Sequence, residues 1–161
     1  MYFFEDNFDD DTIRRHFEFY EPLTVHESSL SPCIHSILAS SLNMKAKAYE
    51  MYLRTSRLDI DDYNNDTEDG LHITSMGGTW MSIVKGFAGA RVNEGRFNFK
   101  PLIPDSWNQL EFNTRINGSF VNIQITKDRI TFNNLTDSSC TIYVHDNEYH
   151  LDSSGTIAID L

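Results

Sequence analysis

Two serines and a histidine stand directly ahead of segments with helical character, where they could bind an anion. Ser28 and Ser29 precede Ser31-Pro32, in which Ser31 is a favourable N-cap and Pro32 fits the first helical turn. His72 follows a turn-rich stretch and precedes a second segment with helical character. Backbone N–H groups at a helix start point outward at the positive end of the helix dipole. These residue types predict a phosphate site made by two loops.

Each of these side chains also has an ordinary structural explanation. A serine hydroxyl in a turn commonly satisfies nearby backbone groups, and a loop histidine commonly makes a capping bond. From its position alone, the capping role is favoured for His72. We interpret His26 and Glu27 as residues that hold the loop in shape, and His35 as a histidine at the core boundary of a helix.

No other group of residues predicts chemistry. The acid-rich residues 59–66 invite a calcium interpretation. If Asp62 begins the ligand series, however, Thr67 stands where an EF-hand loop requires glycine. A solvated, turn-forming loop is the better interpretation. The sequence has no Gly-x-Ser-x-Gly motif, so a Ser-His-Asp triad drawn from these residues would be arbitrary.

The elements that must position the two loops are helical as far as residue 90. Apolar residues recur at helical spacing in four segments. They are Ile13, Phe17 and Tyr20; Cys33, Ile34, Ile37, Leu38 and Leu42; Ala46, Tyr49, Tyr52 and Leu53; and Met76, Trp80, Ile83 and Val84. Gly77 and Gly78 inside the fourth segment cost about 1 kcal/mol each relative to alanine. They therefore predict a close backbone approach to a neighbouring helix or a ligand.

Beyond residue 90 the apolar period changes to two, which is typical of strands. Alternation runs through residues 110–116 and 121–125, and Asn117-Gly118 between them is a strong hairpin turn. Further strands are expected around residues 130–132, 142–144 and 157–159, with a tighter turn at residues 93–95. Short strands at this spacing predict an antiparallel sandwich or jelly roll. This order of helices and then strands predicts an α+β fold or two separate units, with a helical part at residues 1–90 and a stranded part at residues 91–161.

The bulk composition limits the partners. With 161 residues and 40% hydrophobic content the chain is an ordinary globular protein. A formal net charge of −11 argues against nucleic acid or an anionic membrane as a partner. The net charge does not exclude phosphate binding, because salt screens charges that are more than about 8 Å away. Local hydrogen-bond donors therefore decide whether phosphate binds. The two cysteines form no recognisable framework, and no signal peptide or membrane span is expected, so the predicted location is cytoplasmic.

Both loops, at residues 25–37 and 63–80, also resemble those of the glycoside hydrolase family 65 disaccharide phosphorylases, which include maltose, trehalose and kojibiose phosphorylases. Residues 2–6 (Tyr-Phe-Phe-Glu-Asp) and 19–22 (Phe-Tyr-Glu-Pro) fit the same pattern, so the resemblance covers the helical half. It implies that residues 1–90 are the last helices of an (α/α)6 barrel, and that residues 91–161 are its small C-terminal β-sandwich domain. It also implies that Ser28, Ser29 and His72 bind phosphate.

The activity implied by the resemblance is inverting phosphorolysis. An α-linked glucose disaccharide and phosphate would give β-glucose 1-phosphate and a free sugar, with phosphate in the place of the usual catalytic water. The family's general acid is a glutamate in a segment upstream of these residues, and no carboxylate here matches it. We therefore expect a C-terminal fragment that carries the phosphate loops, has no catalytic residue of its own and is inactive alone.

The resemblance implies neither a metal nor an organic cofactor. The expected partners are inorganic phosphate and the disaccharide in the complete enzyme, and a homodimer is left open. The helical half is expected to expose an apolar surface that further barrel helices would cover. The alternative function is a catalytically silent, carbohydrate-associated module that is stable mainly through its β-sandwich.

Overall fold

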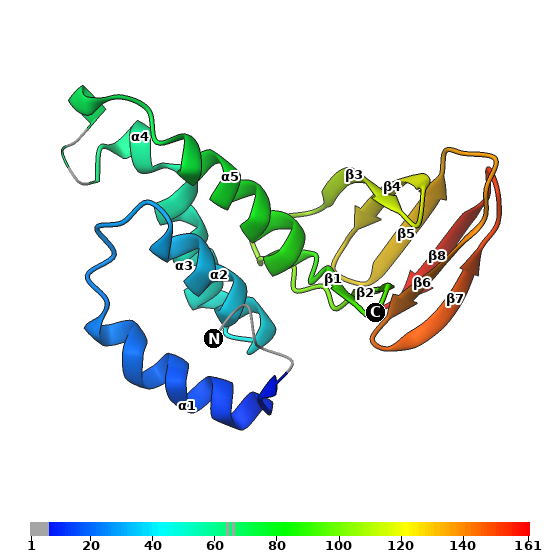
Figure 1. The fold of residues 1–161 in the computed structure, drawn as a ribbon, viewed down its shortest axis with the longest axis horizontal. Coiled ribbons are helices and arrows are strands. Elements are labelled where there is room, and N and C mark those ends of the chain that lie inside the picture. The colour runs from blue at the N-terminus through cyan, green and yellow to red at the C-terminus, as the bar shows by residue number, and fades with distance from the viewer. Residues whose placement is uncertain (1–6, 64, 66) are drawn as a thin grey trace. The chain divides into compact units, whose positions relative to one another are not determined.

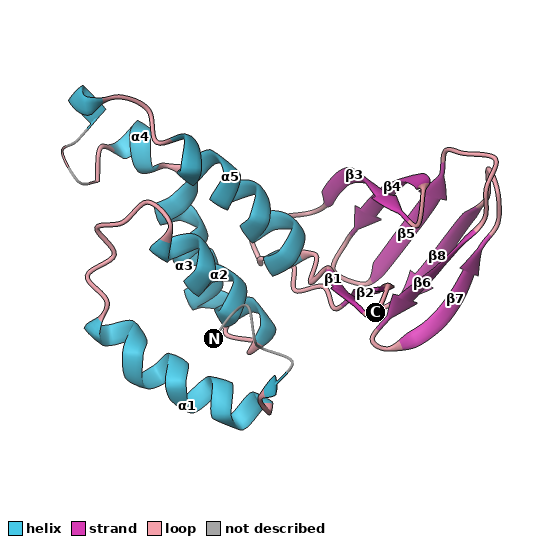
Figure 2. Ribbon diagram, viewed as in Figure 1, coloured by secondary structure: helices cyan, strands magenta, loops and turns pink. Residues whose placement is uncertain are grey.

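A computed structural model describes residues 7–63, 65 and 67–161. The chain divides into two compact units, Met1–Phe87 and Ala88–Leu161 (Figure 1). The first unit is helical and the second is built from strands, as the change of sequence period predicts (Figure 2). The family-like residues 2–6 lie outside the described residues. In the described part of the chain, no helix is long and apolar enough to cross a membrane.

The helical unit contains five α-helices and three shorter or irregular turns among its described residues. They are α1 (Asp10–Tyr20), η2 (Glu21–Leu23), α2 (Ser31–Ser41), α3 (Lys45–Ser56), α4 (Leu58–Asp61), η3 (Thr67–Asp69), α5 (Ile73–Met81) and the π-helical η4 (Ser82–Phe87). Helix α1 begins where Asp9 accepts a hydrogen bond from the Thr12 N–H at 2.6 Å. It buries Ile13 and Phe17, whereas Tyr20 is 58% exposed, so the predicted stripe is buried only in part.

The prediction that Ser31 caps α2 is wrong by one position. Leu30 occupies the N-cap position, and Ser31 is the first helical residue, with Pro32 in the first turn as expected. The Ser31 hydroxyl is not used as a cap because it lies 2.9 Å from Nδ1 of His26. Most of the predicted apolar stripe of α2 is nevertheless buried, with Ile37 fully inaccessible to solvent.

The predicted core face of α3 is also wrong. The buried residues of this helix are Ala48, Met51 and Thr55, while Tyr49 and Tyr52 are half-buried. Two of these three residues, Ala48 and Thr55, are small, and α2 lies close to this face. The Ser36 hydroxyl on α2, for example, donates to the Ala48 carbonyl at 2.9 Å. A pattern of large apolar residues therefore selects the wrong face where helices pack on small ones.

Helix α5 shows the same effect more strongly. Of the predicted face, Met76 and Trp80 are 52% and 54% exposed. The buried face carries Ser75 and Gly78 instead. A Cβ at position 78 would lie 2.9 Å from Cβ of Cys33 on α2, whereas a Cβ at Gly77 would meet nothing within 4 Å. The prediction of a close backbone approach is therefore confirmed for one glycine of the pair.

We predict opposite effects for alanine at these two adjacent glycines. Gly78→Ala should destabilise the helical unit by about 1–3 kcal/mol, because the new methyl group overlaps Cys33. Gly77→Ala should stabilise it by about 0.5–1 kcal/mol, because the helix loses a flexible residue and no contact is strained. Urea unfolding of this chain, followed by helical circular dichroism, measures both changes. Equal effects of the two variants would contradict the close approach at Gly78.

The second unit consists of two four-stranded sheets. Their strands are β1 (Arg91–Asn93), β2 (Arg96–Phe99), β6 (Cys140–Val144) and β7 (Asn147–Leu151) in one sheet, and β3 (Leu110–Ile116), β4 (Ser119–Ile125), β5 (Arg129–Asn134) and β8 (Thr156–Asp160) in the other. The predicted turns are both present. Positive φ angles occur at Asn117 and Gly118 between β3 and β4, and at Glu94 and Gly95 between β1 and β2.

The alternating residues of the strands form the core between the sheets. Every second residue of β4 from Val121 to Ile125 is fully buried. The ring of Phe99 in β2 lies 5.2 Å from that of Phe132 in β5, so the two sheets contact each other face to face. One pairing differs from the expected antiparallel pattern, because β2 and β6 run parallel. Alternation predicts strands and their buried faces but not which strands become neighbours.

Candidate functional site

The two predicted loops lie in contact. The hydroxyls of Ser29 and Thr74 are 2.8 Å apart, across 45 positions of sequence. The Ser75 hydroxyl also donates to the Ser29 carbonyl at 3.2 Å. Ser29 lies just ahead of α2, and Thr74 is in the first turn of α5. The structure therefore places Ser29 beside the start of α5.

This contact follows from how α2 and α5 pack. Contacts between them advance together along the two helical segments. The pairs are Ser29 with Ser75, Cys33 with Gly78, and Ile37 with Gly86. Residue numbers rise on both sides, so the two helices run in the same direction and their N-termini lie at the same end (Figure 1). Two positive dipole ends are thus brought together next to the hydroxyls.

Ser28 makes the local contacts of a turn serine. Its hydroxyl accepts from the Leu30 N–H at 3.3 Å, and its carbonyl accepts from the Ser31 N–H at 3.2 Å. The side chain is exposed, as is that of Thr74, whereas Ser29 is partly buried. Phosphate binding by Ser28 and Ser29 stays a prediction, and the geometry leaves both hydroxyls at the surface where an anion could reach them.

His72 occupies the N-cap position of α5, but its side chain makes no capping bond. Its carbonyl accepts from the Ser75 N–H at 2.9 Å. The ring instead meets Asp59, with Nδ1 lying 2.5 Å from Oδ1. The backbone N–H of His72 donates to the other carboxylate oxygen at 2.9 Å. The capping role favoured for the His72 ring from position alone is therefore wrong.

Asp59 is correspondingly stabilised as an anion. The side-chain hydrogen bond from His72 is the largest cause that lowers the Asp59 pKa, and the backbone bond and the charge of His72 add to it. The interpretation of residues 59–66 as a solvated loop is thus wrong at its start. Helix α4 begins at Leu58, and Asp61 within it binds Arg57 through both oxygens, at 2.6 and 2.7 Å.

Residues 64 and 66, which the calcium interpretation would have required as ligands, lie outside the described residues. Within the described ranges, no three His, Cys, Asp or Glu side chains are grouped so that they could hold a metal ion.

A buried polar cluster supports the loop ahead of Ser28. His26 is only 7% exposed and has a positive φ of 59°. Its carbonyl accepts from Nη2 of Arg54 at 3.1 Å, and its ring packs edge-on against His35 at 4.6 Å. Glu21 lies 3.7 Å from Nε2 of His26. These contacts agree with the interpretation of His26 as a structural residue.

Burial lowers the pKa of His26, and the charges of His35 and Arg54 add to this against the opposite effect of Glu21. Below its ordinary pKa of 6.5, the unfolded chain binds a proton at this residue more readily than the folded chain. We therefore predict that the helical unit loses stability as the pH falls from about 7.5 to about 5.5.

The test of this prediction is chemical unfolding of the wild type and a His26→Asn variant at both pH values. Asparagine tolerates the positive φ and does not titrate. The variant should be less stable than the wild type at both pH values. Its stability should, however, change less between the two pH values. The control variant His150→Asn removes an exposed histidine of the other unit. It should show the same change of stability with pH as the wild type. An unchanged pH difference in His26→Asn would contradict the prediction.

Sequence reasoning missed three residues of the site. Thr74 and Ser75 lie at the start of the fourth helical segment, which the sequence predicts over about residues 74–87, and a hydroxyl pair in a first helical turn close to His72 was a signal that could have suggested them. Asp59 had no such signal, because its partner lies 13 positions along the chain and no short motif links the two.

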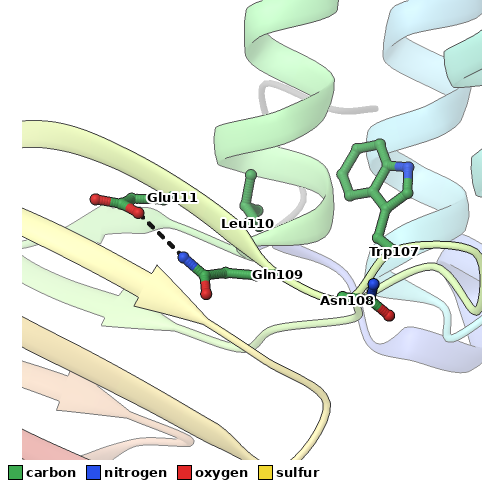
Figure 3. Close-up of a pocket in the computed structure, with 5 residues that line it drawn as sticks. All are labelled: Trp107, Asn108, Gln109, Leu110 and Glu111. Carbon is green, nitrogen blue, oxygen red and sulfur yellow. Dashed lines mark hydrogen bonds between the residues drawn. The ribbon is translucent and has the colours of Figure 1, made fainter.

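Hollows occur beside the candidate site and in the second unit. One, of about 130 Å³, lies beside the candidate site and is lined by Asp59 and Ser75, together with Thr55, Ser56, Leu58, Ile60, Met76 and Thr79. The other, of about 520 Å³, is formed by residues 107–111 of the second unit. Figure 3 shows its side chains, including the hydrogen bond of 3.0 Å from Gln109 to Glu111. It contains no predicted site residue.

Comparison with known protein families identifies both parts of the chain. Residues 1–81 match the glycosyl hydrolase family 65 central catalytic domain. The chain belongs to glycoside hydrolase family 65. Residues 90–151 match the C-terminal domain of the same family. The resemblance drawn from the two loops is therefore confirmed.

Two individual relatives and one solved structure are consistent with this family assignment. The chain is 50% identical over 132 residues to maltose phosphorylase of Bacillus subtilis, covering 82% of this chain and 17% of the relative. It is 40% identical to α,α-trehalose phosphorylase of Thermoanaerobacter brockii, covering 94% of this chain and 20% of the relative. A solved structure from the human microbiome, assigned as a kojibiose phosphorylase, matches all of this chain and 24% of its own length, with 33% identity and a TM-score of 0.92. The chain thus spans about a fifth of the curated relatives it matches.

Proposed function

We propose that this chain is the C-terminal part of an inverting α-glucosyl disaccharide phosphorylase and that Ser28, Ser29 and His72 bind its phosphate. Residues 1–90 would be the last helices of an (α/α)6 barrel, and residues 91–161 a jelly-roll-like β-sandwich domain. The reaction would convert an α-linked glucose disaccharide and phosphate into β-glucose 1-phosphate and a free sugar. The names of the relatives, maltose and α,α-trehalose phosphorylase, support the reaction class.

The observation that carries the proposal is the contact between Ser29 and Thr74 at the paired starts of α2 and α5. It brings two hydroxyls to the starts of two helices that run in the same direction, and His72 lies two residues before Thr74. Phosphate binds well to such a group because helix N–H groups, hydroxyls and an imidazolium all donate to its oxygens. The overall negative charge of the chain is compatible with this, since these donors are local.

The exposed apolar surface of the helical unit supports its place in a larger barrel. Along α5 and just before it, Leu71, Ile73, Met76 and Trp80 are 52–75% exposed. Further large apolar side chains, at Phe19, Leu23, Val25 and Ile60, are 63–72% exposed. A protein that functioned as this unit alone would leave an unusually large apolar area in water. Additional helices of the central catalytic domain would cover it.

In the complete enzyme, phosphate bound here would attack the anomeric carbon while the bond to the leaving sugar oxygen breaks. A general acid supplied by another segment would give that oxygen its proton. The residues of this chain would orient the phosphate and balance its charge. Their contribution rises in the transition state if their hydrogen bonds strengthen as the attack proceeds.

Removing the His72 ring should therefore impair phosphate use in a complete phosphorylase that contains this sequence. His72→Ala should raise the Michaelis constant for phosphate and lower turnover, because a hydrogen bond to a charged group contributes about 1.5–3 kcal/mol. Ser28→Ala and Ser29→Ala should act in the same direction but more weakly, since backbone donors remain at the helix starts.

Steady-state phosphorolysis at varied phosphate concentration measures these effects. His150→Ala, which removes an exposed histidine of the other unit, is the matched control and should behave as the wild type. Wild-type phosphate kinetics in folded His72→Ala would reject the proposed site.

The alternative, a catalytically silent carbohydrate-associated module, is favoured by one observation in the second unit. Trp107 lies in an open hollow beside amide and carboxylate side chains, which together offer a sugar an apolar face and hydrogen-bond partners. Under this alternative, the chain alone should bind maltose, and Trp107→Ala should abolish the binding.

We predict that the chain alone releases no glucose 1-phosphate from maltose, trehalose or kojibiose, because a general acid contributes typically about 10²–10⁴-fold. Adding a separately expressed upstream barrel segment should restore phosphorolysis if the proposal holds. Activity of the chain alone would contradict the assignment of the acid to another segment. Maltose binding without any restored activity would favour the alternative.

A further inference from the structure

We propose that Asp59 is a positioning residue that sets the orientation and proton location of the His72 ring toward phosphate. The inference rests on the proposed phosphate site and adds a residue to it. It stands on the geometry of a single carboxylate that receives two hydrogen bonds from His72, one from the backbone and one from the ring.

The two bonds restrain different parts of His72. The bond from its N–H to Oδ2 of Asp59 fixes the backbone at the N-cap position of α5. The bond at Nδ1 to Oδ1 fixes the rotation of the ring. Asp59 is itself held on α4, where Leu58 is 4% exposed. Together these contacts place the ring relative to the start of α5.

The carboxylate also decides where the ring carries its proton. An ionised carboxylate has only acceptors, so the hydrogen of a neutral ring lies on Nδ1 and the lone pair on Nε2. The bonds from His72 lower the pKa of Asp59, which keeps the carboxylate ionised at neutral pH. Nε2 is then the nitrogen that shares a proton with a phosphate oxygen. A dihydrogen phosphate monoanion donates a proton to Nε2 of the neutral ring, or the protonated ring donates it from Nε2 to the monohydrogen phosphate dianion, and in either form the pair shares that one proton.

Asparagine at position 59 cannot reproduce this arrangement. Its amide has one oxygen acceptor, whereas His72 offers two donors, the N–H and Nδ1–H. If the oxygen accepts from the backbone, the amide nitrogen faces Nδ1 and favours the other tautomer, with hydrogen on Nε2. In serine proteases the equivalent loss of a carboxylate puts the histidine in the wrong tautomer. Glutamate keeps both acceptors but changes their reach.

Asp61 provides a matched control on the same helix. It carries the same charge and pairs with Arg57, at 2.6 and 2.7 Å, rather than with His72. Asp61→Asn therefore removes one negative charge from α4 without altering the contacts of His72. A difference between Asp59→Asn and Asp61→Asn cannot be a general charge effect.

The first experiment reads the ring directly, by ¹⁵N NMR of His72 in this chain. In the wild type and in Asp61→Asn, the neutral ring should carry its hydrogen on Nδ1. In Asp59→Asn the tautomer should shift toward Nε2–H, and Asp59→Glu should keep the wild-type form at least in part. Circular dichroism of each variant verifies that the helices are intact. An unchanged tautomer in folded Asp59→Asn would overturn the proposal.

The second experiment measures phosphorolysis with inorganic phosphate in a complete phosphorylase that contains this sequence. Asp59→Asn should raise the Michaelis constant for phosphate by about ten- to a hundredfold, by analogy with metal-binding histidines that lose the group supporting their second ring nitrogen. The Michaelis constant for the disaccharide should not change, the pH dependence of kcat/KM for phosphate should shift, and Asp59→Glu should recover part of the loss.

The two proposals fail in different ways. If His72→Ala impairs phosphate use and Asp59→Asn does not, the site stands and the role of Asp59 is overturned. If His72→Ala itself keeps wild-type phosphate kinetics, the phosphate site is rejected and the role of Asp59 falls with it. A loss in Asp59→Asn that Asp61→Asn matches would also overturn the positioning role.

Discussion

The close packing of α5 against α2 is the constraint on which the candidate site depends. At position 78 there is room for a hydrogen atom but not a methyl group, because Cys33 lies directly opposite. This approach lets the two helices run side by side in the same direction, and it brings the hydroxyls of Ser29 and Thr74 to 2.8 Å. Larger residues at the contact would separate the helix starts, and the hydroxyls of the two loops would no longer lie side by side.

Around this contact, polar side chains hold the backbone of both loops in place. His26, which is 7% exposed, and the Arg54 side chain that donates to its carbonyl hold the backbone that leads to Ser28. Asp59 likewise holds His72, because its carboxylate accepts from the backbone N–H of His72 and contacts its ring. Both supports use side-chain to backbone bonds, which fix loop geometry more directly than contacts between side chains. Under the proposed function, the hydroxyls of the two loops and the His72 ring would contact the phosphate.

The sequence predicted the elements of this structure better than their contacts. Helical and strand periods, the Asn117-Gly118 turn and the change of structure near residue 90 are local properties, and they appear in the fold. The core faces of α3 and α5 were wrong because tight helix packing buries small residues such as Ala48 and Gly78 and leaves Trp80 exposed. Ser31 lost its expected capping role because a buried histidine competes for its hydroxyl. The partnership of Asp59 with His72 depends on tertiary structure, so no local pattern could reveal it.

The central claim is that one anion binds between the two loops. The most direct measurement is anomalous diffraction from crystals of the complete enzyme soaked in tungstate, a heavier analogue of phosphate. The account predicts one strong anomalous peak within hydrogen-bond distance of Ser29 Oγ and His72 Nε2, ahead of the starts of α2 and α5, and its loss on competition with phosphate. A peak elsewhere in the catalytic domain that phosphate displaces, with none between these loops, would contradict the account.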